Sequence, residues 1–306
     1  MTISVVGSLN MDLIVRAARF PQPGETIHGR SFSTACGGKG ANQAYAVARM
    51  GQSARMIGCV GDDTFADAMM ANLQRAGVDT SSVLCKAGVS SGIAVITVDD
   101  SGQNEIVLAA GANALLDAQA VQSLAAQIQS SDAVIAQLET TLEATETAMR
   151  QARDAGKISI FNPAPGAAMH DELLAVCDWI IPNETEAALL TGISVDGIET
   201  AVKASGILRA RGVRNVLITL GGNGVWVDAA EWRGHVPAFP VTPVDTVAAG
   251  DTFIGAFASR LVEGAAVHDA VHFGNAAAAI AVTRAGAQPS IPTRAEVDAF
   301  LRKLGI

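Results

Sequence analysis

Apolar runs rich in Val and Ile alternate with longer amphipathic segments along most of the chain. Runs that are apolar throughout predict strands buried on both faces of a sheet. These runs are residues 3–9, 54–60, 133–138, 158–161, 179–181 and 216–220. The amphipathic segments predict helices, several of which stop at a glycine. These segments are residues 41–50, 65–75, 118–128, 142–155 and 201–211. The alternation predicts an α/β fold with a mainly parallel central sheet and helices on both faces.

Two segments interrupt this alternation. Residues 11–36 contain Pro21, Pro23 and Gly24 and show no helical period, whereas residues 91–111 have the pattern of a β-hairpin around the turn DDSGQ. We expect both segments to pair into one small β-sheet. Ligands bind at the carboxyl edge of open α/β sheets, so a small sheet above that edge would serve as a lid. The chain, residues 1–306, is expected to form one domain with this lid.

Composition narrows the classes of partner. The chain has 306 residues, of which 49% are hydrophobic and 17% charged, and its net charge is −9. This balance argues against nucleic acid or an anionic membrane as the main partner, because both need a basic surface. A small anion can still be held by local amides and helix ends. The N-terminal run lacks a basic segment and the four cysteines lie far apart, so we expect a cytoplasmic protein with reduced thiols.

The strongest chemical signal lies in VDTVAAGDTFIGAFASRL, residues 244–261. The apolar spacing predicts a helix that begins near Gly250. The small residues Ala248, Ala249 and Gly250 allow a ligand to approach the backbone, and the free amides at a helix start attract an anion. Asp251 would then stand beside a bound phosphoryl group, where a carboxylate can orient an attacking hydroxyl. The alternative is that Asp251 only caps the helix.

Two further segments carry polar residues in unusual places. CGGKGANQAYAVARMG, residues 36–51, predicts a glycine-rich loop before a helix, with Lys39 and Asn42 at the helix start. From this segment alone, a plain glycine-rich turn before a helix is the favoured interpretation. In GSLNMDLIV, Asn10 and Asp12 interrupt an apolar run and share one face, so they could bind sugar hydroxyls. The alternative there is a strand end that turns into solvent.

The order of these motifs resembles the ribokinase-like family of carbohydrate and nucleoside kinases. The resemblance covers nearly the whole chain. It rests on GSLNMD, GGKGAN, NPAP at 162–165, PNETE at 182–186, TLGGNG at 219–224, DTVAAGDTF at 245–253 and AGAQPS at 285–290. It implies a Rossmann-like fold of that family and transfer of a phosphoryl group from ATP to the 5-hydroxyl of ribose.

The resemblance also implies roles for individual residues. Asp251 matches the family's catalytic base, and Ala248, Ala249 and Gly250 match its anion hole. The positions that match the sugar site are Asn10, Asp12, Gly38, Lys39, Asn42, Glu139 and Asp251. The positions that match the ATP site are Asn183, Glu186, Thr219, Gly221, Gly222, Gly224, Gly250 and Asn275. Glu186 would also organise magnesium through water. The positions that match a potassium site are Asp245, Val247, Ala281, Arg284, Gly286 and Ser290.

The expected partners are therefore a small sugar and ATP, with magnesium and potassium as cofactors. The small sheet is expected to pair with a second copy of the chain to give a homodimer. Two alternatives to a ribose kinase remain open. One is a kinase for 2-deoxyribose or another sugar, and the other is a non-catalytic sugar sensor that kept the fold.

Overall fold

The computed structural model of the protein describes residues 1–305, which form a large sheet, a smaller sheet and helices. The large sheet has nine strands in the order β13-β12-β11-β10-β9-β8-β1-β4-β5. All neighbouring pairs from β11 to β5 are parallel, whereas β12 and β13 are antiparallel additions. The strands are β1 (Thr2–Val6), β4 (Ser53–Gly61), β5 (Asp79–Lys86), β8 (Ala133–Ala136), β9 (Ile158–Phe161), β10 (Trp179–Ile180), β11 (Asn215–Thr219), β12 (Val225–Asp228) and β13 (Arg233–Val236).

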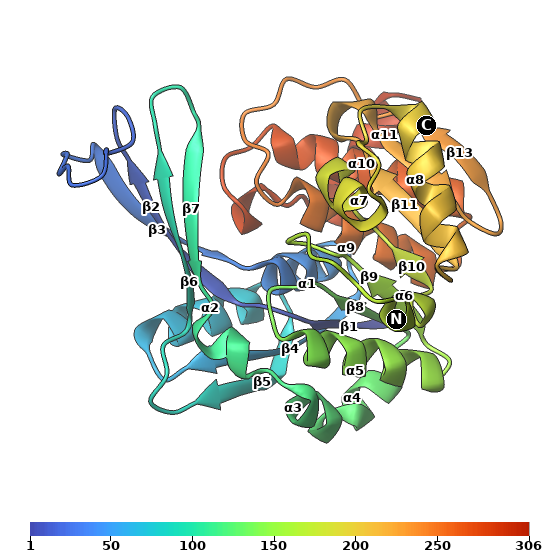
Figure 1. The fold of residues 1–306 in the computed structure, drawn as a ribbon, viewed down its shortest axis with the longest axis horizontal. Helices are drawn as coiled ribbons and strands as arrows, with labels where there is room; N and C mark the ends of the chain where they lie inside the picture. The colour runs from blue at the N-terminus through green and yellow to red at the C-terminus, as the bar shows by residue number, and fades with distance from the viewer. Residues whose placement is uncertain (306) are drawn as a thin grey trace.

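Helices cover both faces of this sheet (Figure 1). Alternate strand residues enter different cores: Ile3 and Val5 join one apolar cluster, and Val6 joins the other. The first cluster includes side chains of α1 (Lys39–Arg49), α2 (Thr64–Arg75), α9 (Ala249–Val262) and α10 (Val267–Val282). The second includes side chains of α3 (Ala118–Ser123), α4 (Ala125–Gln129), α5 (Leu142–Asp154), α6 (Asp171–Ala175), α7 (Glu184–Thr191) and α8 (Ile198–Ala210). Burial on both faces explains why the central parallel strands are mostly apolar.

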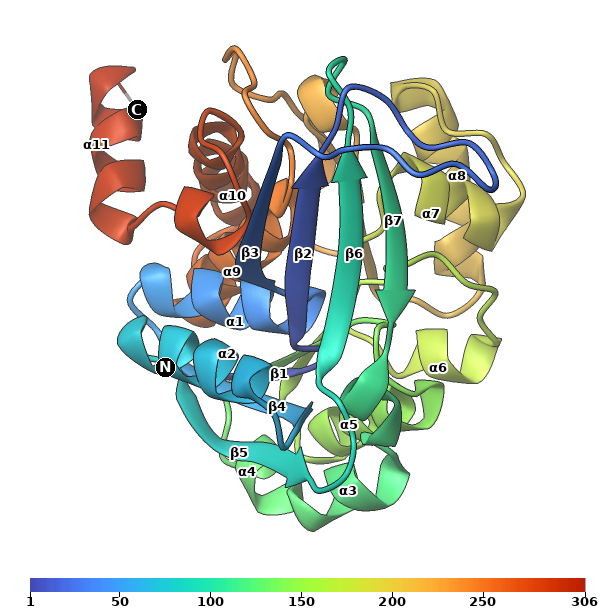
Figure 2. The same cartoon turned by 90° about the vertical axis from the view of Figure 1, so that its left-hand side faces the viewer.

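The small sheet has the order β3-β2-β6-β7. Figure 2 shows its strands side by side: β3 (Ser31–Gly37), β2 (Asn10–Arg16), β6 (Gly92–Val98) and β7 (Asn104–Ala109). β2 is antiparallel to β3 and parallel to β6, and β6 is antiparallel to β7. In Figure 1 this sheet projects from the helix-covered body at the left. The predicted fold class, a mainly parallel helix-covered sheet with a separate small sheet, is therefore confirmed.

Some predicted boundaries are wrong. The apolar run at 3–9 is not one strand: β1 ends at Val6, and Asn10 begins β2 in the other sheet. The chain must turn at Gly7, where a Cβ atom would lie 2.0 Å from Oε1 of Gln137. The predicted helix at 118–128 is two helices, because Leu124 leaves the helical conformation. Strands β5, β12 and β13 were missed.

The remaining elements are a helix and three short turns of helix. They are α11 (Arg294–Lys303), η1 (Gly111–Leu115), η2 (Gly221–Asn223) and η3 (Gln288–Ser290). Among residues 1–305, no helix is both long enough and apolar enough to cross a bilayer.

Candidate active site

The start of α9 leaves backbone donors without partners. Ala248 precedes the helix with φ 59°, and it is the one non-glycine residue with a positive φ in the described part of the chain. Such a conformation is strained for alanine and occurs mainly at functional sites. The amide of Ala249 donates to the carbonyl of Thr246 at 3.3 Å. The amides of Gly250 and Asp251 have no acceptor within residues 1–305, so two donors remain for an anion.

Asp251 does not cap its own helix. Its side chain is 7% exposed, and its two carboxylate oxygens accept hydrogen bonds from consecutive residues of α1. Asn42 Nδ2 donates to Oδ2 at 3.0 Å, and Gln43 Nε2 donates to Oδ1 at 2.9 Å. The carboxylate is therefore fixed in place from another helix. The capping alternative is not what the structure shows.

A cavity of about 200 Å³ opens beside this carboxylate. It is lined by residues from α1, α7, α9 and the end of β11, which meet at the carboxyl edge of the sheet. These residues include Lys39, Asn183, Glu186, Thr219, Gly250 and Asp251. The sequence-predicted base, anion hole and part of the predicted ATP site therefore share one cavity.

Charges of both signs lie around this cavity. Burial works against the charge of Lys39, but the carboxylates of Asp251, Glu139 and Glu186 together raise the pKa of Lys39 above its usual value. Burial also raises the pKa of Glu186, although the hydrogen bond from the Asn183 amide and the charge of Lys39 act to lower it. One half-buried ammonium thus stands among three carboxylates, which need cations or hydrogen-bond donors to stay charged.

Asn183 and Glu186 have a structural task as well. They form a capping box at the start of α7: the Asn183 amide donates to Glu186 Oε2 at 2.9 Å, and the Glu186 amide donates to Asn183 Oδ1 at 2.8 Å. This pairing holds Glu186 at the cavity wall. Carboxylate oxygen is the kind of donor that magnesium prefers, so Glu186 fits the expected role beside magnesium.

Two of the predicted sugar residues, Asn10 and Glu139, line a second cavity of about 340 Å³ together with Asn113 and Leu108. Two others, Lys39 and Asp251, line the first cavity. Glu139 Oε2 accepts from the Ser8 hydroxyl at 2.6 Å and from Asn10 Nδ2 at 3.4 Å. It also accepts from the backbone amide of Lys39 at 3.0 Å. Because Lys39 lines the first cavity, the start of α1 joins the two.

Asn113 was missed by the sequence analysis. Its Nδ2 donates to Asn10 Oδ1 at 2.8 Å and to the carbonyl of Leu9, which orients the Asn10 amide toward Glu139. An asparagine in the stretch AAGANA carries no recognisable signal by itself.

Asp12 lies beside this second cavity on the same face of the small sheet as Asn10. Burial, and to a smaller extent the charge of Glu139, raises the pKa of Asp12 to about 7. Its carboxylate packs against Gly37, where a Cβ atom would lie 2.5 Å from Oδ2. Gly38 has φ 91°, and a Cβ atom there would lie 2.7 Å from the amide nitrogen of Asn10. Both glycines therefore permit an approach that no other residue allows.

The residues expected at the nucleotide lie around the end of β11. Thr219 ends this strand and bridges to Asn183, and η2 contains Gly221 and Gly222. Gly224 has φ 89° and packs against the backbone that follows β13. Asn275, on α10, already donates to the carbonyls of Val236 at 3.3 Å and Pro237 at 3.1 Å. Its amide group thus has a structural role, whatever it contributes to a nucleotide.

The expected potassium residues are brought together in part. Asp245 Oδ1 accepts from the amide of Val247 at 3.0 Å, and its Oδ2 accepts from the amide of Gly286 at 2.9 Å. The carbonyl of Ala281 accepts from the amide of Arg284, whose side chain pairs with Glu296 at 2.6 Å. Ser290 donates to the carbonyl of Ala287. Asp245 therefore joins residues 245–247 to residues 281–290 as one loop pair, whose backbone carbonyls could bind a cation.

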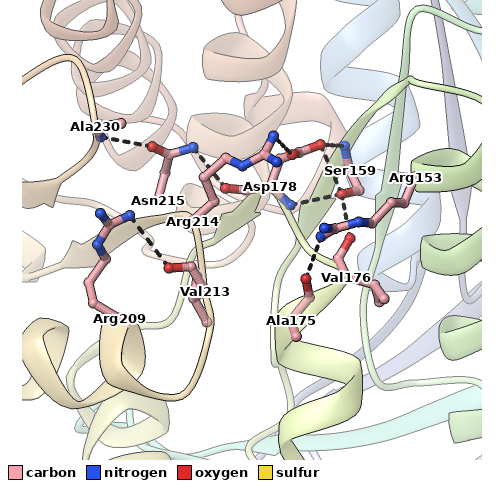
Figure 3. Close-up of polar contacts among 10 residues, drawn as sticks. All are labelled: Arg153, Ser159, Ala175, Val176, Asp178, Arg209, Val213, Arg214, Asn215 and Ala230. Atoms are coloured by element: carbon pink, nitrogen blue, oxygen red, sulfur yellow. Dashed lines mark hydrogen bonds and ion pairs between the residues drawn. The ribbon is translucent and has the colours of Figure 1, made fainter.

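A larger cavity, of about 540 Å³, lies at the opposite edge of the sheet, where β9, β10 and β11 begin. Figure 3 shows that its polar groups bond to one another. Asp178 accepts from Arg214 at 2.8 Å and from the amide of Ser159 at 3.0 Å. The Asn215 side chain connects the carbonyl of Asp178 with the amide of Ala230. These satisfied groups leave the carboxyl edge as the better candidate site.

Comparison with known proteins shows the family of the chain. The family model for pfkB family carbohydrate kinases matches residues 2–294. A ribokinase of Haemophilus influenzae is 43% identical over 300 residues, which cover 98% of each chain. A deoxyribokinase of Salmonella typhimurium is 37% identical over 98% of this chain and 99% of that one. The structure of Arabidopsis thaliana ribokinase complexed with ribose and ATP is similar with a TM-score of 0.93, at 31% identity over 98% of both chains.

Proposed function

This chain belongs to the pfkB family of carbohydrate kinases, and we propose that it transfers the γ-phosphoryl group of ATP to the 5-hydroxyl of D-ribose. The products would be D-ribose 5-phosphate and ADP. One observation carries the proposal: the Asp251 carboxylate, held by α1, shares a cavity with the free amides at the start of α9.

In the proposed reaction, ribose binds in the cavity of Asn10 and Glu139 with its 5-hydroxyl toward Asp251. Asp251 orients this hydroxyl and takes its proton late, because the transition state of phosphoryl transfer is loose. The amides of Gly250 and Asp251, with Ala248 and Ala249 shaping the turn, stabilise the charge on the transferred group. The proton ends on the Asp251 carboxylate, and the bond to the ADP oxygen breaks as the bond to the sugar oxygen forms.

The nucleotide would lie along the end of β11, against Thr219 and the glycines of η2. Glu186 would hold magnesium through water beside the phosphates, where the ion would neutralise developing charge. Potassium would bind among the carbonyls of residues 245–247 and 281–290 and hold that loop pair in shape.

A kinase for 2-deoxyribose is the closest competing reading, and the deoxyribokinase relative supports keeping it. We favour ribose because the Asp12 carboxylate and Glu139 Oε1 have no hydrogen-bond partner within residues 1–305, although Glu139 Oε2 is already bonded. A site that bonds a hydroxyl discriminates against an analogue that lacks it. The test is ATP consumption with D-ribose, 2-deoxy-D-ribose, D-fructose and D-arabinose. We expect kcat/KM for ribose to exceed that for 2-deoxyribose by at least about tenfold. A preference for 2-deoxyribose would overturn the assignment.

The same assay separates a kinase from a sugar sensor. A sensor would bind ribose in calorimetry without consuming ATP. The kinase is favoured because the chain keeps the Asp251 carboxylate, the free amides at the start of α9 and the capping box of Asn183 and Glu186. Ribose binding with no turnover of any sugar in the presence of magnesium and potassium would support the sensor.

The small sheet has two different faces. Its inner face carries Asn10 and Asp12, and Leu108, which pairs across β6 in register with Asp12, lines the sugar cavity. We propose that this face closes over the sugar as a lid and excludes water. The outer face carries Val107, 68% exposed, and Phe32, 64% exposed.

We propose that this outer face pairs with a second copy of the chain to give a homodimer, because an exposed apolar sheet surface is a site for association. Val107→Asp should convert the dimer to a monomer in size-exclusion chromatography with light scattering. Gln103→Asp, in the exposed turn beside the same strand, is the matched control. A parent protein that is monomeric at micromolar concentration would contradict this proposal.

A further inference from the structure

We propose that two directed chains of side-chain amides converge on the carboxylate of Asp251 and hold it for the reaction. The inference rests on the role of Asp251 in the proposed function. It assigns a positioning role to residues that have been given no role so far: Gln43, Asn72, Arg75, Gln137 and Gln288.

The first chain begins at the surface of α2. Arg75 Nη2 donates to Asn72 Oδ1 at 3.2 Å, and Asn72 Nδ2 donates to Gln288 Oε1. Gln288 Nε2 donates to Asn42 Oδ1 at 3.1 Å. Asn42 Nδ2 then donates to Asp251 Oδ2 at 3.0 Å. Each amide in this chain accepts on its outer side and donates toward Asp251.

The second chain begins inside the protein. Gln137 Nε2 donates to Gln43 Oε1 at 2.6 Å, and Gln43 Nε2 donates to Asp251 Oδ1 at 2.9 Å. The same Gln43 nitrogen donates to Asn162 Oδ1 at 3.1 Å, and Asn162 Nδ2 donates to the carbonyl of Ile181 at 2.9 Å. Gln43 and Gln137 are both 0% exposed, so water cannot replace these bonds.

The direction of the first chain is set by chemistry at both ends. An amide oxygen and an amide nitrogen have similar shapes, so their order must follow from their partners. A carboxylate only accepts, so Asn42 must turn its nitrogen to Asp251 and its oxygen to Gln288. Gln288 must then turn its nitrogen to Asn42 and its oxygen to Asn72. Asn72 in turn directs its nitrogen to Gln288 and its oxygen to Arg75. A guanidinium only donates, so the far end requires the same orientation as the near end.

This arrangement does two things for Asp251. It bonds both oxygens from different directions, so the carboxylate cannot rotate away from the acceptor hydroxyl. It also aligns successive amide dipoles toward the negative charge, and hydrogen bonds in such chains strengthen one another. No cation bonds directly to this carboxylate among residues 1–305; Lys39 and Glu186 are the charged groups that face it across the cavity.

Reversing the hydrogen-bond direction at Asn72, near the outer end of the first chain, tests the inference. Asn72→Asp keeps the side-chain shape on a partly exposed residue but can only accept. Gln288 must then turn its nitrogen outward and Asn42 must follow, which brings an amide oxygen against Asp251 Oδ2. We expect kcat with D-ribose to fall by about 10- to 100-fold, the effect of losing one hydrogen bond to a charged group. KM for ATP should change by less than about twofold, because the nucleotide residues are untouched.

The matched control is Gln74→Glu. It adds the same charge on the same helix, but Gln74 is exposed and its amide donates to Thr80 at 2.9 Å, away from the chain. We expect kcat close to that of the parent. Equal kcat in Asn72→Asp, Gln74→Glu and the parent, with all three folded by thermal unfolding, would overturn the inference.

Gln137→Met tests the second chain independently of the first. It removes the donor to Gln43 with a side chain of similar length, and we expect a several-fold loss of kcat with unchanged KM for ATP. If Asn72→Asp fails to fold, parent-like kcat in Gln137→Met refutes the proposal. Asp251→Asn distinguishes failure of the proposed function from failure of this inference. If Asp251→Asn stays active, the proposed function fails. If Asp251→Asn is inactive but Asn72→Asp has the kcat of the parent, only the inference on the amide chains fails.

Discussion

Replacement of Gly255 by alanine tests whether the packing of α9 against α1 sets the position of Asp251. Gly255 is buried one turn after Asp251 and faces α1. A Cβ atom at Gly255 would lie 2.5 Å from Cβ of Ala46 and 3.0 Å from the amide nitrogen of Val47. None of these atoms can rotate aside, so the helices themselves must separate.

The size of the effect follows from these distances. Carbon atoms in contact prefer about 3.5–4.0 Å, so α9 must move by about 1 Å. Overpacking of this kind costs about 1–3 kcal/mol, while alanine in a helix regains about 0.5–1 kcal/mol. We therefore expect a net loss of about 1–2 kcal/mol in the free energy of unfolding. A displacement of about 1 Å at the chemical groups should lower kcat by about 10²-fold.

Gly206 offers the matched control. It lies inside α8, and a Cβ atom there would meet nothing within 4 Å. Gly206→Ala should raise the free energy of unfolding by about 0.5–1 kcal/mol and leave kcat unchanged. The measurements are urea unfolding and ribose-dependent ATP turnover. A Gly255→Ala variant as stable and as active as the parent would refute the reasoning.

Three further outcomes are expected. Asp251→Asn should lower kcat by about 10²–10⁴-fold while ribose still binds in calorimetry, and undiminished turnover would exclude Asp251 as the base. Because burial and Glu139 raise the folded-state pKa of Asp12 to about 7, above its unfolded value, stability from the protonated acid should be present at low pH and be lost as the pH rises through about 7. KM for ribose should fall over the same range as the carboxylate forms, and a pH dependence that persists in Asp12→Asn would assign it to another group. Replacement of potassium by tetramethylammonium should lower kcat if a cation shapes residues 245–247, and equal rates in both salts would remove that site.

The fold class could be predicted because hydrophobic periodicity is a local property. The parallel strands are buried on both faces, so β8 is apolar throughout, β9 and β11 are mostly apolar, and all three are recognisable from the sequence. β12 and β13 are four residues each and join the sheet edge in antiparallel register, with too few positions to show a period. The first apolar run misled because residues 7–9 are as buried as β1, although the strand has already ended at Val6.

The start of α9 could likewise be located from its residues. Small residues before an amphipathic helix leave free amides that can attract an anion. The sequence could not tell whether Asp251 caps its helix or faces a cavity. Only the packing of α1 against α9 decided this, by bringing Asn42 and Gln43 to the carboxylate.

The sequence by itself thus determined the fold class, most strands and helices of the central sheet, and which loop can approach an anion. The tertiary structure decided which side chains meet: Asn42 and Asp251 are 209 residues apart in the chain, and Gln288 and Asn42 are 246 apart. The physical reason is that periodicity and backbone freedom are set by near neighbours along the chain. Hydrogen bonds between buried amides depend instead on where separate helices come to rest against one core.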